Sequence, residues 1–243
     1  MDAGSIALLR GLAQEIGIGI SDKQAARFGV YCDLLAEWNR KFNLTGIEGE
    51  GDVVLKHIID SLTIVKYFAA PPGLKYIEVG TGAGFPGIPI KIVLEDMIDA
   101  TLIEASEKKV KFLDEVMMQL NMKGINALHK RAEDAARYPE YRGSADIVAA
   151  RAVAPLPMLL EICVPLLKPG GILIAMKAAW EAVEVELKSA ANALDVLGAE
   201  LGHIDRFCLP GSDIQRSVIQ VKKVKETPDR FPRRPGVPAK KPL

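Results

Sequence analysis

The chain has 243 residues, of which 49% are hydrophobic and 26% are charged, and its formal net charge at pH 7 is zero. A chain of this kind can bury a substantial core, either as one large α/β domain or as a domain with an appendage. No apolar run approaches the roughly 18 residues needed to span a bilayer, and the amino terminus lacks a secretory pattern. We therefore expect a cytoplasmic protein with no membrane segment.

The cysteine pattern argues against a disulfide-stabilised domain and against a zinc-binding domain. Cys32, Cys163 and Cys208 are odd in number and scattered, with no CxxC pair. This pattern supports neither a disulfide framework nor a zinc ribbon. We expect three buried thiols and no metal site.

The first part of the chain has a helical pattern. Ser21 and Gln24 fit a capping box, and apolar residues follow at spacings of three and four from Phe28 to Phe42. A second helical segment is predicted over 52–69 and ends at Pro71-Pro72. We expect residues 1–72 to form a helical cap.

After residue 72 the pattern alternates between strands and helices, which is typical of a parallel sheet with crossover helices. Two last strand candidates follow each other without a helix, so a hairpin makes the final strand antiparallel. The predicted domain, 73–225, is therefore α/β, with a seven-stranded, mostly parallel sheet. The predicted strands are 75–79, 100–104, 125–128, 145–150, 172–177, 200–208 and 214–222, and the predicted helices are 86–95, 106–120, 131–137, 155–167 and 180–197.

The carboxyl-terminal part, 226–243, is called the tail. From Lys222 onward there are eight Lys or Arg and two acidic residues, and five of the fifteen prolines lie in 228–243. The prolines predict neither a helix nor a central strand for 228–243. A basic tail on an acidic body suggests contact with a polyanion, RNA above all, while a solvated tail that only aids solubility is the alternative.

A glycine loop follows the first predicted strand, in "IEVGTGAGFPGIPI" (77–90). It lacks the Gly-Lys-Ser/Thr ending of a phosphate-binding P-loop. The third glycine of a dinucleotide fingerprint falls at position 85, which is Phe85. This weakens the interpretation as an NAD-dependent dehydrogenase and leaves it open.

An acid and alternating glycines remain, which resembles motif I of the class I methyltransferases. Glu78 ends the strand and Gly80, Gly82 and Gly84 follow it. S-adenosylmethionine carries an ammonium group, a carboxylate and a sulfonium, so a nearby acidic side chain can attract its positive charges. The glycines have no side chains, so the backbone of the loop can approach the cofactor closely. Glu104 ends the next strand, where an acid is expected to accept the ribose hydroxyls.

Several stretches resemble one family, the bacterial small-subunit ribosomal RNA guanine-N7 methyltransferase G, formerly glucose-inhibited division protein B. The resemblance covers the chain from the cap to the tail, and the pairing of GTGAGFPGIP with RAVAPL is its most specific part. The stretches are "EWNRKFNLTGI" (37–47), "HIIDSL" (57–62), "EVGTGAGFPGIPIKI" (78–92), "IEASEKKVKFLDEV" (103–116), "RAEDAA" (131–136), "ARAVAPLPMLLE" (150–161) and "PDRFPRRPGVPAKKPL" (228–243).

The resemblance implies S-adenosylmethionine as cofactor, a class I (Rossmann-like) methyltransferase fold, and contacts to the cofactor from particular residues. Gly80 and Phe85 are implied as contacts, Ala132 and Glu133 are expected along the adenine, and Arg151 at the cofactor end of the fourth strand. For two of them a structural role is the alternative: packing at a helix start for Phe85, and a salt bridge to a helix-terminal carboxylate for Arg151.

The implied reaction needs few chemical devices, because guanine N7 offers a free lone pair at neutral pH and no general base is required. In line with this, the chain has Ala154-Pro155-Leu156-Pro157 where exocyclic-amine methyltransferases carry an Asn/Asp-Pro-Pro-aromatic motif, and Cys163 lies in an apolar helical stretch. The residue that holds the guanine is not identified. Candidates are Arg151, Lys177 at the end of the fifth strand, and Asn43 and His57 from the cap.

The implied partner is 16S rRNA, free or within the small ribosomal subunit, at a guanine of the 530 loop. We expect the tail and the cluster Lys108-Lys109-Lys111 to contact phosphates, and the protein to be a monomer. Three alternatives stay open: an NAD-dependent dehydrogenase, a non-catalytic factor that binds rRNA, and a methyltransferase for small molecules.

Overall fold

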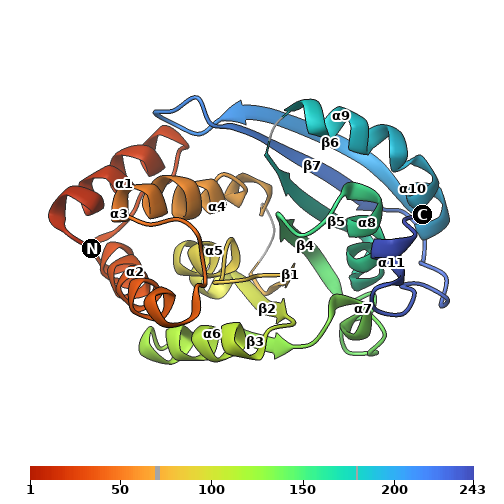
Figure 1. Ribbon diagram of the computed structural model, residues 1–243, viewed down its shortest axis with the longest axis horizontal. Coiled ribbons are helices and arrows are strands. Elements are labelled where there is room, and N and C mark those ends of the chain that lie inside the picture. Colours follow the sequence, from red (N-terminus) through yellow and green to blue (C-terminus); the bar gives the residue numbers. More distant parts are fainter. Residues whose placement is uncertain (69–71, 179) are drawn as a thin grey trace.

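The structure is a computed structural model that describes residues 1–68, 72–178 and 180–243. A single mixed sheet runs through the molecule, with helices on both of its faces (Figure 1). This confirms the predicted α/β class. No helix in the described part of the chain is long and apolar enough to cross a membrane.

The sheet has the strand order β3-β2-β1-β4-β5-β7-β6. β7 lies between β5 and β6 and is antiparallel to both, while the pairs among β1 to β5 are parallel. The predicted hairpin and antiparallel last strand are therefore confirmed. The strands are β1 (Leu74–Val79), β2 (Ile98–Glu104), β3 (Ile125–His129), β4 (Ala145–Arg151), β5 (Leu167–Lys177), β6 (Ala199–Cys208) and β7 (Gln215–Lys223).

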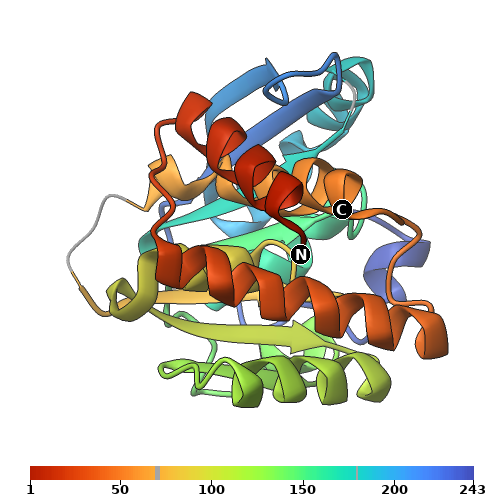
Figure 2. The same ribbon diagram turned by 90° about the vertical axis from the view of Figure 1, so that its left-hand side faces the viewer.

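The cap helices cover one face of the sheet (Figure 2). Helices α1 (Ala3–Glu15) and α2 (Asp22–Phe42) pack there with α5 (Gly87–Leu94) and α6 (Glu107–Gln119). The predicted capping box is present, since Ser21 Oγ accepts from Gln24 N and the Gln24 side chain accepts from Ser21 N. Apolar side chains from the cap and from the sheet form one cluster on this face. The division into residues 1–72 and 73–225 stays a prediction.

The second helical segment of the cap has an unusual backbone. The predicted helix over 52–69 is a chain of short pieces, and the predicted end at Ala69 to Pro71 lies outside the described residues. Its centre is a π-helical turn. This wide helical form is rare in proteins, and where it occurs it often lies at a functional site. The pieces are α3 (Glu50–Val53), the π turn (Val54–Ile59), α4 (Asp60–Leu62) and a 3-10 turn (Val65–Tyr67).

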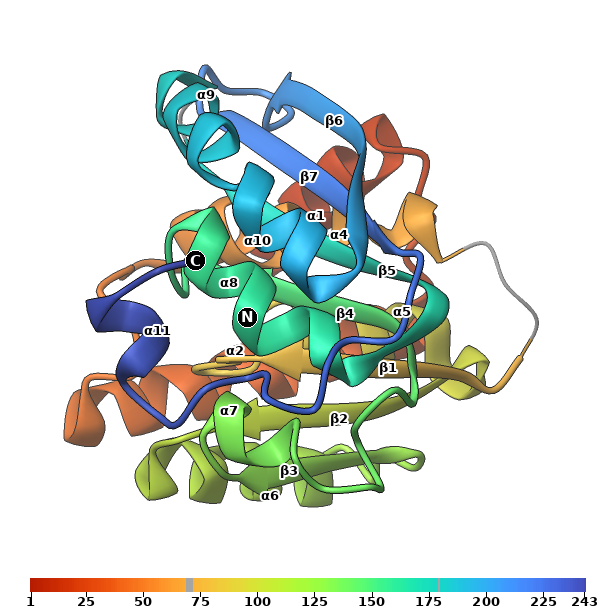
Figure 3. The ribbon, with the colours of Figure 1, turned by 90° about the vertical axis from the view of Figure 1, so that its right-hand side faces the viewer.

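The opposite face carries the later helices and the tail (Figure 3). The predicted helix over 180–197 is two helices, which meet at Ala190. The helices of this face are α7 (Ala132–Ala135), α8 (Leu156–Cys163), α9 (Trp180–Ser189), α10 (Ala191–Leu197) and α11 (Val237–Lys240).

Two predictions are wrong in part. The tail does contain a helix, the single turn α11, because Pro238 lies in its first turn, where the N–H that proline lacks would have no helical partner. Cys208 is exposed, since it ends β6 at the edge of the sheet, whereas Cys32 and Cys163 are buried as expected.

A candidate cofactor and guanine site at the carboxyl edge of the sheet

The glycine loop leaves β1 at the carboxyl edge, where parallel sheets of this type bind ligands. Gly80 N donates to the Ile103 carbonyl oxygen at 2.9 Å, which ties the loop to the end of β2. Gly80, Gly82 and Gly84 all have positive φ angles, of 68°, 61° and 96°. Side chains other than hydrogen are strained in this region, so the backbone shape explains the alternating glycines.

The surroundings of these glycines differ in a way that locates the open side of the loop. A Cβ atom on Gly80 would lie 2.7 Å from Val153 Cγ2, and one on Gly84 would lie 2.6 Å from Ile88 Cγ1. A Cβ atom on Gly82 would meet nothing within 4 Å. Gly82 therefore faces the space in which a ligand can approach the backbone.

Glu104 joins this loop from the end of β2. Its Oε2 accepts from Gly82 N at 2.9 Å and its Oε1 accepts from Ser106 N at 2.8 Å. Each carboxylate oxygen can accept a further hydrogen bond. The position fits an acceptor for hydroxyl groups of a ligand, as expected for this residue.

Glu78 lies beneath the loop and has no exposed surface. Burial raises the pKa of its carboxyl group to about 7, because the charged form is desolvated, and the Thr81 hydroxyl, the Tyr76 hydroxyl and the Arg151 charge oppose this rise only in part. Tyr76 Oη donates to Glu78 Oε2 at 3.1 Å. Among the described residues, Glu78 Oε1 and Thr81 Oγ1 are buried without a partner in full hydrogen-bond geometry, and the Thr81 hydroxyl lies close to the Glu78 carboxyl group. A buried acid below an open glycine loop fits a cofactor that brings a cationic amino group.

Phe85 connects the loop to the cap. Its ring is 4% exposed and stacks on the His57 ring, with centroids 4.3 Å apart and planes at 13°. Tyr31 of α2 lies at 5.3 Å from the same ring, and its hydroxyl donates to the Ala83 carbonyl oxygen. Phe85 thus packs at the start of α5, and a role in binding the cofactor stays a prediction.

Arg151 ends β4 and is bound by the π turn of the cap. Its Nη1 donates to Asp60 Oδ2 at 3.1 Å and to the Lys56 carbonyl oxygen at 3.2 Å. Arg216 of β7 donates from Nε to the other oxygen, Asp60 Oδ1, at 3.0 Å. Asp60 is 3% exposed, so two guanidinium groups share one buried carboxylate. The salt bridge considered for Arg151 is present.

His57 completes this cluster and is neutral. Its Nδ1 lies 2.8 Å from Arg151 Nη2, which only donates, so Nε2 carries the proton and donates to Thr45 Oγ1 at 2.7 Å. Burial, together with the charges of Arg151 and Arg216, lowers the pKa of His57 to about 3. We call Asp60, Arg151, Arg216, His57 and Thr45 the Asp60 network.

A cleft of about 560 Å³ opens beside the network and the segment that follows β4. Lys177, at the end of β5 as predicted, lines it, donates to the Ala154 carbonyl oxygen and pairs with Glu186 Oε2 at 2.6 Å. Asn43 does not line this cleft. It is exposed and ends α2 in a left-handed conformation with φ of 50°. The charged side chains of the cleft are Lys56, Arg151, Lys177, Arg216, Asp60 and Glu186.

Ala132 and Glu133 begin α7, after the end of β3. Both are nearly buried, at 8% and 6% exposure. Glu133 Oε1 accepts from Gly236 N of the tail at 3.3 Å. Lys130 N donates to the Glu104 carbonyl oxygen, which places the start of α7 next to the end of β2.

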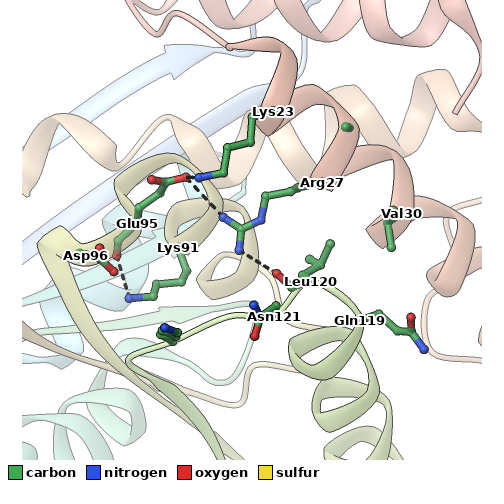
Figure 4. Close-up of a pocket in the computed structure, with 11 residues that line it drawn as sticks. Lys23, Arg27, Val30, Lys91, Glu95, Asp96, Gln119, Leu120 and Asn121 are labelled. Carbon is green, nitrogen blue, oxygen red and sulfur yellow. Dashed lines mark hydrogen bonds and ion pairs between the residues drawn. The ribbon is translucent and has the colours of Figure 1, made fainter.

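A second cleft, of about 510 Å³, lies at the amino edge of the sheet, between α2 and the ends of α5 and α6 (Figure 4). Glu95 Oε1 accepts from Lys23 Nζ at 3.0 Å and from Arg27 Nη1 at 3.5 Å. This cleft is remote from the glycine loop and contains none of the predicted site residues.

Three residues of the site, Asp60, Arg216 and Glu186, are not among those that the sequence predicted. Arg216 lies in a strand 156 residues after Asp60, and no motif marks it. Only its position as an arginine in an otherwise strand-forming run hinted at a buried partner. Among the described residues, no group of three or more His, Cys, Asp or Glu is arranged to hold a metal ion.

The chain has extensive sequence relatives. It is 46% identical over 231 residues to a ribosomal RNA small subunit methyltransferase G of Acetivibrio thermocellus, covering 95% of this chain and 93% of the relative. A protein of the same name from Geobacillus sp. is 41% identical, with 96% of each chain covered, and one from Desulforamulus reducens is 43% identical, with 97% of each covered.

Solved structures share the fold at low sequence identity. A SAM dependent methyltransferase from Aquifex aeolicus aligns with a TM-score of 0.52 and 17% identity, covering 71% of this chain and 93% of that chain. TYW2 of P. horikoshii in complex with MeSAdo aligns with a TM-score of 0.54 and 15% identity, covering 68% and 62%.

These findings confirm the predicted class I methyltransferase fold and the predicted cofactor, S-adenosylmethionine, and they disfavour the dehydrogenase alternative. Residues 24–207 match the GidB family, described as rRNA small subunit methyltransferase G. The chain belongs to the rRNA small subunit methyltransferase G family.

Proposed function

We propose that this protein transfers a methyl group from S-adenosylmethionine to N7 of a guanine in the 530 loop of 16S rRNA. The relatives named above are ribosomal RNA small subunit methyltransferases, which supports the RNA as substrate. The choice of N7 rests on the chemistry of the cleft.

Each carboxylate of the cleft is paired with a cation, and this observation carries the proposal. Asp60 accepts from two arginines, and Glu186 accepts from Lys177 and from Leu156 N, both at Oε2. His57 is neutral, but its one acceptor nitrogen faces Arg151. A carboxylate held by a cation is a weaker base, so the described part of the cleft suits a nucleophile such as N7 that carries its own lone pair.

The cofactor, when bound, supplies an electrophilic methyl group on a sulfonium. Gly82, Glu104 and Glu78 would hold it, through open backbone and the oxygens of the two acidic side chains. The protein's own contribution is alignment of the two reactants, which in favourable cases is worth about 7 kcal/mol or more. The buried, cross-linked Asp60 network provides a rigid wall for that alignment.

Arg151 is the best candidate to hold the guanine. Its five N–H donors include three that bind Lys56, Asp60 and His57. The remaining two suit either the O6 atom of a guanine or the carboxylate of the cofactor. We propose that they orient the base, since Arg151 lines the cleft itself.

Exposed cations gather around the same edge of the sheet, from elements that are distant in sequence. An RNA loop that reaches the cleft has to approach from this edge, and a flipped or looped-out guanine is the accessible form. This supports an RNA substrate over a small molecule. The residues are Arg40 and Lys41 at the end of α2, Lys108 and Lys111 in α6, Arg131 before α7, and Arg234, Lys240 and Lys241 around α11.

The test is transfer of a labelled methyl group to small ribosomal subunits and to free 16S rRNA from cells that lack the modification, followed by mapping of the labelled nucleotide. We expect label at N7 of one guanine in the 530 loop, and the better substrate shows which form is used. Binding of the cofactor without label in either RNA would refute this substrate. Label on an exocyclic amine would refute the argument from the paired carboxylates.

The predicted phosphate contacts of the tail need a gentler test than truncation, because the tail is packed against the domain. Replacing Arg234, Lys240 and Lys241 by Gln should lower the slope of log affinity for RNA against log salt by about two, if each loses one phosphate. The matched control replaces Lys23, Lys75 and Lys123 by Gln; these exposed residues lie at the amino edge of the sheet. Equal slopes in both triple variants would contradict the contact.

A further inference from the structure

The tail is docked by a buried ion pair. Glu161 of α8 has no exposed side-chain surface, and both of its oxygens are bound by Arg233 of the tail. Arg233 donates from N and Nε to Glu161 Oε1, each at 2.8 Å, and from Nη2 to Glu161 Oε2 at 2.6 Å. A bidentate guanidinium fixes direction as well as distance.

A second arginine fixes the backbone that leads to this pair. Arg142 donates from Nη2 to the Thr227 carbonyl oxygen and from Nη1 to the Phe231 carbonyl oxygen, both at 2.8 Å. Phe231 is 5% exposed and packs in the apolar cluster of this face. The tail therefore has one defined path over α8, and it is not a solvated appendage.

This path brings the tail to α7 at the carboxyl edge (Figure 3). Gly236 has a φ angle of 82°, which turns the backbone so that its N–H donates to Glu133 Oε1 at 3.3 Å. The strand end before Glu133 is tied to the loop after β2, since His129 Nε2 lies 3.1 Å from the Ala105 carbonyl oxygen. Glu133 thus lies one loop away from Glu104, which binds Gly82 N.

We propose that the tail is a working part of the cofactor site. The Arg233–Glu161 pair sets the path of the tail, and Gly236 N–H then holds the Glu133 carboxylate in the position from which it binds the cofactor. Arg233 and Gly236 are positioning residues that act through Glu133. The proposal rests on the cofactor site at the carboxyl edge and goes beyond the contacts with RNA phosphates.

The experiment is a double-mutant cycle on binding of S-adenosylhomocysteine to the full chain, measured by calorimetry without RNA. We expect Arg233→Ala to raise the Kd about fivefold, the size of one charge-assisted hydrogen bond that is partly lost. In the Glu133→Ala background the same change should have no further effect, because the carboxylate through which it acts is gone. Arg233→Lys, which keeps the charge but not the fork, should give a smaller rise in the same direction and serves if the alanine variant does not fold.

Two controls separate positioning from loss of stability. Arg230→Ala changes an exposed arginine of the tail that lies over the Phe231 ring. Ile162→Val removes one buried methylene from the helix that carries Glu161. Both should leave the Kd unchanged.

An unchanged Kd in the Arg233 variants, or an equal rise in both backgrounds, would overturn the proposal and leave the cofactor site intact. If the unaltered protein did not bind S-adenosylhomocysteine, the cofactor site itself would be wrong, so the two failures are distinguishable.

Discussion

The glycine loop and the Asp60 network lie next to each other at the carboxyl edge of the sheet, and they are built by opposite means. The loop is held through backbone atoms: it has three left-handed glycines within five residues, and its backbone groups bond to Ile103, Glu104 and Tyr31. The network is held by side chains from the cap, β4 and β7, and its two ion pairs join residues that are 91 and 156 positions apart. The loop can therefore be altered locally, whereas the network ties together most of the fold.

The largest effect is expected in the network. Asp60→Ala leaves two mostly buried guanidinium groups, 16% and 19% exposed, without their carboxylate. The free energy of unfolding should fall by about 3 to 5 kcal/mol, as measured by urea denaturation. Asp52→Ala is the matched control, because its pair with Lys56 is on the surface and should contribute less than about 1 kcal/mol. Similar losses in both variants would show that the network is not a special structural element.

The second effect concerns Glu78, beneath the glycine loop, and it appears as a dependence of the free energy of unfolding on pH. The Glu78 carboxyl has a pKa of 4.5 when unperturbed and about 7 in the fold, so the unfolded state gives up its proton first. The free energy of unfolding therefore falls as pH rises from about 4.5 to about 7, by up to about 3 kcal/mol. Glu78→Gln should raise stability at pH 8, change it little at pH 4, and weaken binding of the cofactor.

His57 of the Asp60 network changes the pH dependence of stability in the opposite direction to Glu78. The His57 pKa is lowered from 6.5 to about 3, so its contribution is complete above pH 6.5 and is lost as pH falls toward 3. Thermal unfolding from pH 4 to 8 of Glu78→Gln and His57→Gln should therefore give changes in slope of opposite sign. Slopes of the same sign would contradict the assigned protonation states.

The third effect separates two glycines of one loop. Gly82→Ala introduces strain of about 1 to 2 kcal/mol in a left-handed conformation, with free space around the new Cβ atom. Gly80→Ala carries the same strain and also displaces Val153. We expect Gly80→Ala to be the less stable variant by urea denaturation. Gly82→Ala should lose less stability but should bind S-adenosylhomocysteine more weakly, because its new methyl group lies on the open side of the loop. The reverse order of stability would place the open side of the loop elsewhere.

The smallest effect is expected where the two regions meet. Ala152 follows Arg151 and has a φ angle of 55°. This left-handed conformation is strained for any residue with a Cβ atom, and glycine adopts it without that strain. Ala152→Gly should raise the free energy of unfolding by less than about 1 kcal/mol, since glycine also gains entropy in the unfolded chain. A loss of stability would mean that the Ala152 methyl group packs favourably in the cleft.

The sequence was sufficient for the features that depend on local pattern. Alternation of strand and helix runs predicted all seven strands, six of them within two residues at each end, while β5 begins five residues before its predicted start. The spacing of Gly80, Gly82 and Gly84 predicted the loop. Contacts between residues distant in sequence could not be predicted from local pattern. Asp60 and Arg216 approach each other only because β7 inserts between β5 and β6. The same limit explains the tail, whose prolines indicate an irregular backbone but not its docking on Glu161.

The ion pair between Glu161 and Arg233 has a consequence for synthesis of the protein. Glu161 precedes Arg233 by 72 residues, so the growing chain contains the carboxylate well before its partner. A buried, unpaired carboxylate is costly, so until Arg233 has been made Glu161 has to be protonated or stay in contact with water. We therefore expect this face to reach its final packing only when the tail has been synthesised.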